Sequence, residues 1–555
     1  MYKKRYDDWL NNSKISEKDK EVLRKYSDEE VEDAFFQELS FGTAGLRGKL
    51  GLGTNRMNLY TVGRAAEGLA RTISKRGEAA KKRGVAISYD VRHFSKEFAE
   101  LSASILAGNG IKTYLYDDFK TTPLLSYTVL NLNTIAGIMV TASHNPKDYN
   151  GYKVYWEDGA QINDEIADEI SKEISEVKDY GKYSFVSLGE GLSSGLIEYI
   201  GEEIEKDYLN KTINLSFTDD FDKDIKIVCT PLNGTGNLPV RYVLAERGFK
   251  NLHVVKEQEM PDSDFTTVGY PNPEDPKAFK LAEKLAREVK ADIIIGTDPD
   301  CDRIAIGILK EDRSYEYISG NKIGVLLIDF ITSVIDRKKL EKSFMVKSIV
   351  TGSLGQKIAM SRGVDFYESL TGFKNISGVA LDVEARSDKM FLFGYEESIG
   401  FLFGRLVRDK DAVVSAMLIA EMVGYHKKRG RSLLEELESV YKEYGYHRDL
   451  LVQKVIEGSS GKAKMETIMK DLREKSPNEI GGHEVTKKID YLMDDTGLQK
   501  SNVLKFFLGS SWLAVRPSGT EPKIKFYIEA TSDNRDESLK LEEEIKNFIE
   551  DILKK

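Results

Sequence analysis

The chain has 555 residues, of which 41% are hydrophobic and 31% are charged, and its formal net charge is −10. This length is too great for one hydrophobic core, so we expect several domains, and the composition is ordinary for a globular protein. Because the sequence holds no basic excess to neutralise a nucleic-acid backbone, these numbers exclude a general nucleic-acid binder, whereas an anionic small substrate stays possible where basic residues cluster locally.

Two further features of the sequence concern targeting and the redox compartment. The N-terminal segment has no apolar core of signal-peptide length, and no run of about 20 apolar residues occurs in the chain. The two cysteines, Cys229 and Cys301, form no disulfide framework and suit a reducing compartment. We therefore expect a cytoplasmic protein with no membrane or nucleic-acid partner, present as a monomer or a weak homodimer.

In chain order, residues 1–39 read as charged amphipathic helices, and Ser27 or Asp28 is a suitable N-cap in "SDEEVEDAFFQEL". Short apolar strands followed by helical patterns then recur, which predicts an α/β fold with buried, mostly parallel sheets. The predicted strands are 84–90, 136–140, 224–230, 291–296 and 390–394. In such sheets the loops at the carboxyl ends of the strands form the ligand crevice.

Changes of pattern along the chain predict the domain boundaries. Beyond about residue 447 shorter alternating strands and a terminal helix replace the α/β pattern, which indicates an α+β domain. We expect a helical extension followed by four domains, at 1–39, 40–205, 206–318, 319–447 and 448–555.

The first chemical signal is "DPDCDR", in which Asp298, Asp300 and Asp302 alternate directly after a buried strand. Alternation in an extended loop can point three carboxylates at one centre, and oxygen ligands without His or thiolate favour Mg²⁺ over Zn²⁺. An EF-hand is excluded because its sixth and twelfth loop positions are occupied by Arg303 and Leu309. The alternative is a solvated acidic turn, which leaves three repelling carboxylates without a cation.

The second signal is "AVRPSGTEPKIK" near the C-terminus. Arg516 can grip a phosphate with two N–H groups, Ser518 and Thr520 offer hydroxyls, and a turn at Gly519 can aim backbone N–H groups at an anion. A plain hairpin turn is the alternative interpretation. Two further lysines in the same segment favour phosphate.

The third signal is "GIMVTASHNPKDYNGY", where Ser143 follows an apolar strand. Ser143 could cap a turn, attack a carbonyl or carry a phosphate, and its surroundings lack the G-x-S-x-G pattern of carbonyl hydrolases. Beside a Mg²⁺ loop and a phosphate loop, a phosphoryl carrier is the favoured interpretation.

Together these loops resemble a known family. "TASHNP", "DPDCDR", "GYEESIG" and "RPSGTEP", in this order and spacing, are similar to the α-D-phosphohexomutase superfamily, and "FGTAGLRG" is most similar to its phosphoglucomutase/phosphopentomutase branch. The resemblance implies a heart-shaped enzyme with four domains around a central cleft. Three of these would be related mixed α/β domains, and the fourth would be a C-terminal α+β domain that binds phosphate.

The resemblance also implies roles for single residues. Ser143 would be the phosphoserine, with Mg²⁺ held by Asp298, Asp300, Asp302 and a phosphoserine oxygen. Arg47 and Arg303 would line the cleft beside it. The sugar and its other phosphate would be bound by Thr371, Lys374, Glu396, Ser398, Arg516, Ser518, Gly519 and Thr520.

Different branches of the family suggest different residues as general acid and base. Similar phosphoglucomutases suggest His144 and Lys410, whereas another branch has a histidine just after the sugar loop, where this chain has Phe401. Lys410 can act as a base only if its surroundings lower its pKa, and a surface lysine is the alternative.

The implied reaction is the interconversion of glucose 1-phosphate and glucose 6-phosphate through a phosphoserine enzyme, with glucose 1,6-bisphosphate as intermediate and activator. Phosphopentomutase and phosphomannomutase activities need the same machinery and stay open. A Mg²⁺-dependent sugar phosphatase and an inactive sugar-phosphate binder are more distant alternatives. The C-terminal domain is expected to be the moving part.

Overall fold

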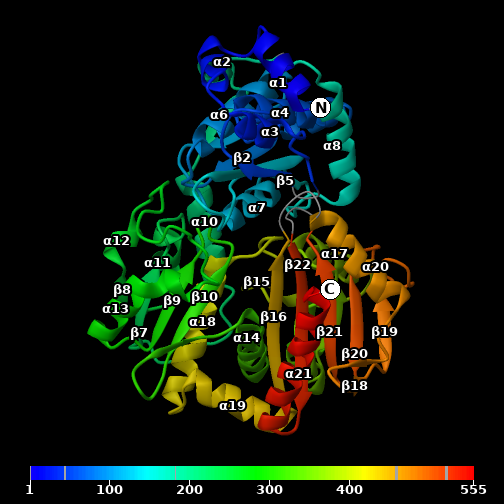
Figure 1. The fold of residues 1–555 in the computed structure, drawn as a ribbon. Helices are drawn as coiled ribbons and strands as arrows, with labels where there is room; N and C mark the ends of the chain where they lie inside the picture. The colour runs from blue at the N-terminus through cyan, green and yellow to red at the C-terminus, as the bar shows by residue number, and fades with distance from the viewer. Residues whose placement is uncertain (1, 43–44, 182, 457–460, 519–522, 555) are drawn as a thin grey trace. The chain divides into compact units, whose positions relative to one another are not determined.

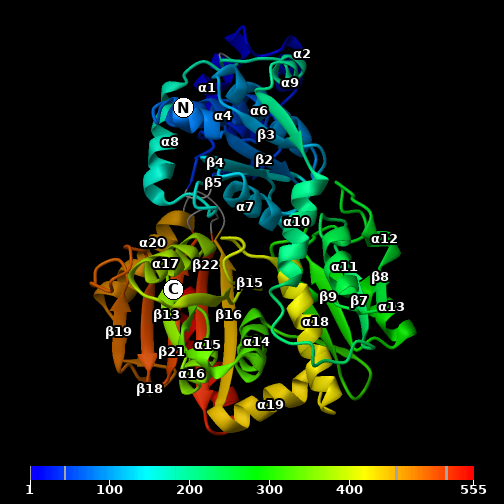
Figure 2. The same ribbon diagram turned by 180° about the vertical axis from the view of Figure 1, so that it is seen from behind.

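The structure is a computed structural model, and it describes residues 2–42, 45–181, 183–456, 461–518 and 523–554. The chain forms two compact units. Unit 1 comprises Met1–Tyr317 and Gly400–Gly424, and unit 2 comprises Ile318–Ile399 and Tyr425–Lys555. Figure 1 and Figure 2 show the elements of both units from opposite sides.

Three helices open unit 1: α1 (Tyr2–Asn11), α2 (Glu17–Leu23) and α3 (Asp28–Phe35). Ser27 caps α3 in a reciprocal capping box with Glu30, so of the two predicted N-caps Ser27 is confirmed and Asp28 is the first residue of the helix. The helices bury a small core of their own, in which the rings of Trp9 and Phe35 meet edge to face at 5.5 Å.

The first sheet of unit 1 has six strands in the order β1-β5-β4-β2-β3-β6. They are β1 (Leu46–Lys49), β2 (Val85–Tyr89), β3 (Thr113–Tyr116), β4 (Ala136–Val140), β5 (Tyr149–Trp156) and β6 (Ile197–Ile200). The parallel neighbours are β4, β2, β3 and β6, whereas β1 and β5 run antiparallel to their partners. The mixed sheet agrees with the predicted α/β class.

Helices cover both faces of this sheet (Figure 1, Figure 2). The helices of this part of the chain are α4 (Leu59–Ser74), α5 (Glu78–Arg83), α6 (Ser95–Gly108), α7 (Thr122–Asn131), α8 (Asp164–Glu176), α9 (Leu188–Ser193) and α10 (Glu202–Ile213), of which α10 packs against α7 and α11 (Asn237–Glu246). Along β5 the side chains alternate, so Tyr152 and Val154 join the main core while Tyr155 packs in a second cluster with Leu125 of α7. This alternation aims the odd-numbered side chains of β5 at the α7 face.

The second sheet of unit 1 has the order β11-β10-β9-β7-β8. Its strands are β7 (Lys226–Thr230), β8 (Asn251–Val254), β9 (Ile293–Thr297), β10 (Ile304–Leu309) and β11 (Tyr315–Tyr317). Its helical segments are α11 (Asn237–Glu246), α12 (Lys256–Glu259), η1 (Pro276–Phe279) and α13 (Lys280–Val289). β7, β8 and β9 are parallel, and β10 returns antiparallel to β9, so the aspartate loop lies at the carboxyl end of a buried strand.

Unit 1 is completed by a later segment of the chain that contains β15 (Gly400–Phe403) and the start of α18 (Ala412–Lys428). Gly400 forms an isolated bridge with Arg303, and the amide of Ala412 donates to the carbonyl of Cys301 at 3.2 Å. These contacts bring the segment that carries Lys410 to the aspartate loop.

Unit 2 begins with a parallel sheet in which β12 (Ser343–Ser348) lies between β13 (Asp365–Ser369) and β14 (Met390–Glu396). Its helices are α14 (Gly320–Val334), α15 (Arg337–Glu341), α16 (Leu354–Ser361), α17 (Phe373–Arg386) and α19 (Leu433–Tyr444).

The C-terminal part of unit 2 is an antiparallel sheet in the order β16-β22-β21-β20-β19. It is built from β16 (Tyr446–Val455), β19 (Lys487–Asp490), β20 (Leu504–Leu508), β21 (Ser511–Pro517) and β22 (Lys523–Ser532), with the small pair β17 (Glu479–Ile480) and β18 (His483–Glu484) beside it. The helices α20 (Gly461–Glu474) and α21 (Arg535–Lys554) complete it. Alternating strands followed by a terminal helix match the predicted α+β domain.

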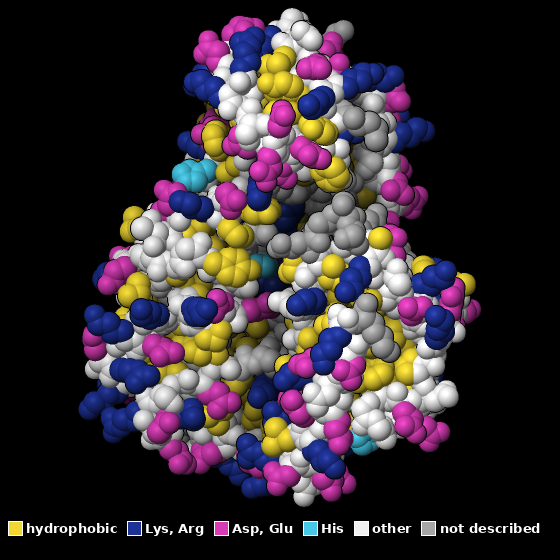
Figure 3. All heavy atoms as spheres, viewed as in Figure 1, with side chains coloured by type: hydrophobic (Ala, Val, Ile, Leu, Met, Phe, Trp, Pro, Cys, Tyr) yellow, Lys and Arg dark blue, Asp and Glu magenta, His cyan; other side chains and the backbone are white. Residues whose placement is uncertain are grey.

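Two further observations concern the lengths of the helices and the charges on the surface. Among the described residues, none of the helices is both long enough and apolar enough to span a bilayer. Acidic and basic side chains are interspersed over the face drawn in Figure 3.

Candidate active site

Ser143 lies in the loop that follows β4, and its side chain is buried, with 4% of the residue exposed. Its backbone is left-handed, with a φ of 53°, which is uncommon for a residue with a Cβ. The Ser143 amide donates to Thr141 Oγ1 at 2.8 Å, and the Thr141 hydroxyl donates to Asp90 Oδ2 at 2.6 Å. A buried carboxylate of the neighbouring strand thus fixes the turn that presents Ser143.

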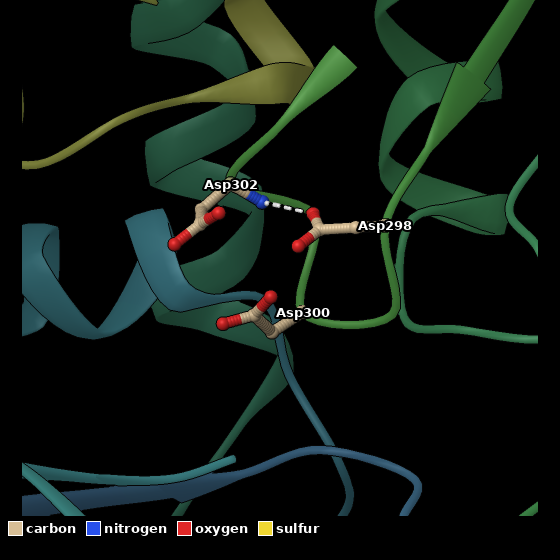
Figure 4. A group of neighbouring side chains, drawn as sticks. All are labelled: Asp298, Asp300 and Asp302. Carbon is tan, nitrogen blue, oxygen red and sulfur yellow. Dashed lines mark hydrogen bonds between the residues drawn. The ribbon is translucent and has the colours of Figure 1, made fainter. Parts of the chain in front are cut away.

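The aspartate loop follows β9, and its three carboxylates converge as predicted (Figure 4). Each of Asp298, Asp300 and Asp302 is buried, and ligand oxygens of all three lie within 4.8 Å of one another. Asp298 Oδ1 accepts the amides of Asp302 at 3.1 Å and Arg303 at 3.0 Å, so the backbone of the turn orients the first carboxylate.

The serine loop and the aspartate loop meet within unit 1. The Ser143 hydroxyl donates to Asp298 Oδ2 at 2.6 Å, although 155 residues separate the two in sequence. His144 Nδ1 lies 3.2 Å from the same hydroxyl. Ser143 therefore stands directly between a carboxylate of the proposed metal site and an imidazole.

The donor set fits a hard divalent cation. Asp300 Oδ1 and Asp302 Oδ1 are buried and accept no hydrogen bond from the described residues. Burial, together with the charges of Asp300 and Asp302, raises the pKa of Asp298 well above its usual value. A cation among these oxygens would relieve that repulsion, and oxygen-only ligands are those that Mg²⁺ prefers.

Two lysines already contact the three carboxylates. Lys153 of β5 lies 2.8 Å from Asp300 Oδ2 and 3.3 Å from Asp302 Oδ2, and Lys410 lies 3.1 Å from Asp302 Oδ2. Burial opposes the charge on Lys153, but Asp300 and Asp302 outweigh it and raise the pKa of Lys153.

Lys153 was missed by sequence reasoning. The available signal was a lysine inside the otherwise apolar strand "GYKVYW", because a buried lysine needs an acidic partner.

Lys410 is buried rather than exposed on the surface, with 8% of the residue accessible. Asp409 Oδ1 lies 3.1 Å from its Nζ, and Asp409 Oδ2 accepts the hydroxyl of Tyr155 at 2.6 Å and the amide of Gln161 at 2.7 Å. The surface alternative for Lys410 is therefore wrong. Asp409, Tyr155 and Gln161 are further members of the site that the sequence did not reveal.

The two predicted cleft arginines lie beside the serine loop. Arg47 Nη1 donates to Asn145 Oδ1 at 3.3 Å, and Arg303 Nη1 lies 3.7 Å from Glu274 Oε1. Loss of hydration, followed by the charges of Arg303 and Arg47, lowers the pKa of His144 well below its usual value. His144 is therefore neutral at physiological pH.

The predicted sugar-binding residues lie in unit 2. Glu396 ends β14 and accepts the amide of Gly372 at 2.6 Å, so it lies next to the "TGFK" loop that carries Thr371 and Lys374. Thr371 begins that loop, and its carbonyl accepts Asn375 Nδ2 at 2.8 Å, while Lys374 lies in the first turn of α17. Ser398 follows in the turn after β14 and is half-buried.

Glu397 was not predicted, although it sits beside Glu396. It accepts the hydroxyl of Thr351 at 3.1 Å, and burial, followed by the charge of Glu396, raises its pKa to about 7. A carboxyl that titrates near neutral pH beside the sugar loop is a functional candidate.

The predicted phosphate residues also lie in unit 2. Arg516 stands on β21 opposite Lys525 of β22, and the Ser518 amide donates to the carbonyl of Lys523 at 2.7 Å. Gly519 and Thr520 lie outside the described residues. Burial, followed by the charges of Glu397 and Glu396, raises the pKa of Tyr527, while Arg516 acts in the opposite direction. The sugar loop and the phosphate strand therefore act on a common neighbour, Tyr527.

The predicted site residues thus form two groups, one in each unit. Unit 1 holds Arg47, Ser143, His144, Asp298, Asp300, Asp302, Arg303 and Lys410. Unit 2 holds Thr371, Lys374, Glu396, Ser398, Arg516 and Ser518.

Comparison with known proteins gives a consistent family. Four models of phosphoglucomutase/phosphomannomutase domains match: α/β/α domain I at residues 38–181, domain II at 206–310, domain III at 319–444 and the C-terminal domain at 456–546. A phosphoglucomutase of Staphylococcus epidermidis is 40% identical over 93% of this chain and 95% of its own length. One from Staphylococcus aureus is 39% identical over 93% and 94%.

Solved structures show the same fold at lower identity. The open form of parafusin, a phosphoglucomutase from Paramecium, has a TM-score of 0.70 at 18% identity and covers 93% of this chain and 95% of its own. A phosphoglucomutase/phosphomannomutase family protein from Burkholderia thailandensis has a TM-score of 0.67 at 16% identity, covering 91% and 96%. The chain therefore belongs to the phosphoglucomutase/phosphomannomutase family of enzymes, within the α-D-phosphohexomutase superfamily.

Proposed function

We propose that the protein interconverts glucose 1-phosphate and glucose 6-phosphate, with Ser143 as the phosphoryl carrier. The observation that carries the proposal is the buried Ser143 hydroxyl, 2.6 Å from Asp298 in a cluster of three carboxylates. A serine used only as a turn cap would need no such acidic cluster. The glucose assignment is supported by the curated phosphoglucomutases that match nearly the full chain.

Asp298, Asp300 and Asp302, with an oxygen of phosphorylated Ser143, would hold Mg²⁺. When bound, Mg²⁺ would offset the negative charge that develops on the oxygens of the transferred phosphoryl group. Lys153 adds a fixed positive charge beside the carboxylates and keeps Asp300 ionised.

The first half-reaction moves the phosphoryl group from Ser143 to the O6 hydroxyl of glucose 1-phosphate. The bond between Ser143 Oγ and phosphorus breaks and the bond from O6 forms. Lys410 Nζ, in its neutral form, takes the O6 proton, and the leaving Ser143 Oγ takes up one proton. Asp409 and Tyr155 hold Lys410 for this step. The product is glucose 1,6-bisphosphate.

The second half-reaction begins after glucose 1,6-bisphosphate has reversed its orientation in the site. It transfers the phosphoryl group on O1 of the sugar to Ser143. His144 is neutral and has Nδ1 3.2 Å from Ser143 Oγ, so it can take the serine proton as the new bond to phosphorus forms. The bond between phosphorus and O1 breaks, and Lys410 returns its proton to O1. Arg47 and Arg303 would stabilise the phosphoryl charge beside the serine.

Unit 2 would supply the groups that hold the sugar in both orientations. Glu396 and Ser398 would accept and donate hydrogen bonds to sugar hydroxyls, with Lys374 and Thr371 beside them. Arg516, Ser518, Gly519 and Thr520 would bind the phosphate that does not react. Hydroxyls related by a half-turn of the sugar can meet the same acceptors, which is what a bisphosphate that reverses in the site requires.

Phosphorus NMR tests the proposal directly. Glucose 1-phosphate is incubated with the protein, Mg²⁺ and a trace of glucose 1,6-bisphosphate, and parallel samples contain mannose 1-phosphate or ribose 1-phosphate. Glucose 6-phosphate formed fastest, without inorganic phosphate, is the expected result. Faster conversion of the ribose or mannose substrate would overturn the sugar assignment, and release of inorganic phosphate would indicate a phosphatase instead.

A further inference from the structure

Arg92 donates several hydrogen bonds to the serine loop, and its side chain is fully buried. Its Nη2 donates to the carbonyls of Ser143 and Asn145, both at 2.5 Å. Its Nη1 donates to the carbonyls of Pro146 at 2.9 Å and Tyr149 at 3.2 Å. One guanidinium group thus ties together four carbonyls of the segment 143–149.

Asp90 fixes Arg92 from the strand side. Its Oδ2 lies 3.2 Å from Arg92 Nε, and its Oδ1 accepts the Arg92 amide at 2.9 Å. The same carboxylate accepts the hydroxyls of Thr141, at 2.6 Å, and Ser95, at 2.7 Å. Asp90 and Arg92 therefore hold both ends of the turn at Ser143.

The other face of the guanidinium is closed by the second domain of unit 1. The Phe265 ring lies under the Arg92 guanidinium carbon at 5.0 Å, and Phe265 is fully buried with a left-handed φ of 47°. Ser263 donates to the carbonyl of Val91 at 2.7 Å. We use the name support turn for residues 262–265.

A second set of contacts joins the support turn to the serine loop directly. Asp264 Oδ1 lies 3.0 Å from Lys147 Nζ, on the serine loop, and 3.3 Å from His93 Nε2. These ion pairs are exposed and contribute little to stability. They nevertheless show that the support turn meets the serine loop at Lys147 as well as through Arg92.

We propose that Arg92 and Phe265 are positioning residues for the phosphoryl carrier, through which the support turn of the second domain fixes the left-handed turn at Ser143. Planar guanidinium geometry is required, because a single ammonium group cannot reach four carbonyls at once. The aromatic face beneath Arg92 replaces the water that a buried guanidinium would otherwise need. The proposal rests on the function proposed above.

Substitutions at both positions test this role. In F265L and R92K we expect kcat for glucose 1-phosphate to fall about tenfold and about a hundredfold, because a small displacement of a reacting atom is costly. KM should change less than threefold, since neither residue is among the groups proposed to bind sugar. F265Y, which keeps the ring, should retain at least half of the wild-type kcat.

Phe221 provides the matched control. It is a buried phenylalanine of the same domain whose ring lies 5.3 Å from the guanidinium of Arg247, outside the serine loop. F221L removes the same group from the same kind of contact and should keep wild-type kcat, with a loss of melting temperature comparable to that of F265L.

The outcomes separate the two proposals. No mutase turnover by the wild type would refute the proposed function. With an active wild type, equal kcat in F265L and F221L, or a change confined to KM, would overturn the positioning role. If F265L does not fold, S263A and R92K test the same contacts, and kcat of both within twofold of wild type would be the contradicting result.

Discussion

At the scale of single residues, charge balance around Asp300 and Asp302 is the dominant feature. Lys153 and Lys410 meet these carboxylates inside unit 1, yet one oxygen of each carboxylate still lacks a described donor. Lys153 neutralises part of the cluster permanently, and a divalent cation would neutralise the rest. A bound divalent cation should therefore restore part of the stability that is lost when Lys153 is removed.

A lysine substitution tests this compensation. In K153M the carboxylates lose their fixed partner, and breaking a buried pair typically costs about 3–5 kcal/mol. Without added metal, we expect a marked fall in the melting temperature relative to wild type. Added Mg²⁺ should then raise the melting temperature more in K153M than in wild type, because binding to the folded state stabilises it.

The control for K153M is K147M, which removes an exposed lysine from the loop that precedes β5. Thermal unfolding in EDTA and in excess Mg²⁺ gives the two melting temperatures needed for each of wild type, K153M and K147M. An equal Mg²⁺ response in K153M and wild type would contradict the compensation.

The sequence predicted the residues that lie in loops better than those inside strands. Ser143 and the three aspartates follow apolar strands, where sheet geometry gathers ligand groups, so their meeting could be expected. Lys153 and Tyr155 inside β5, and Arg92 in the loop after β2, could not be placed in the same way. Their roles depend on partners from 51 to 254 positions away, and no local pattern specifies such partners.

At the scale of elements, β20 carries a lysine into the interior of unit 2. Lys505 is buried, its Nζ donates to the carbonyl of Ile349 at 2.7 Å, and it lies 4.0 Å from the ring centre of Trp512. Burial, followed by the charge of Lys347, lowers the pKa of Lys505 to about 7, although Glu368 and Glu529 oppose the shift.

This shift makes the stability of unit 2 depend on pH. Between about pH 7 and the ordinary lysine pKa of about 10.4 the unfolded chain holds a proton on Lys505 that the folded chain lacks. The free energy of unfolding should therefore rise with pH in this window, by up to about 1.4 kcal/mol per pH unit. K505M should lose that rise.

Urea unfolding at pH 7, 8 and 9 measures the effect. K487M, at an exposed lysine of the neighbouring strand β19, is the matched control and should retain the wild-type slope. Identical slopes for K505M and wild type would show that Lys505 keeps its proton in the folded state.

At the scale of the whole molecule, the fourth domain and the third domain outside residues 400–424 fall within one compact unit. Glu529 of β22 is fully buried and accepts the amide of Ser353 at 2.7 Å, across the line between these domains. It also contacts His447 Nδ1 at 3.0 Å and Trp512 Nε1. The sequence led us to expect that the C-terminal domain is the moving part, and this buried network favours its movement together with the third domain.

Hydrogen exchange tests whether the two domains move together. We expect the amide of Ser353 to exchange slowly with and without glucose 1-phosphate, because breaking its bond would leave Glu529 buried with fewer donors. Faster exchange at Ser353 when substrate binds would instead mean that the C-terminal domain separates from the third domain.

The central claim is that Ser143 carries the phosphoryl group, and phosphopeptide mapping by mass spectrometry tests it most directly. The protein is incubated with glucose 1,6-bisphosphate and Mg²⁺, digested and sequenced, with S143A treated in parallel. We predict one phosphate on the peptide that contains "TASHNPK", and neither phosphate nor mutase turnover in S143A. Phosphate on a different residue, or turnover that survives in S143A, would contradict the account.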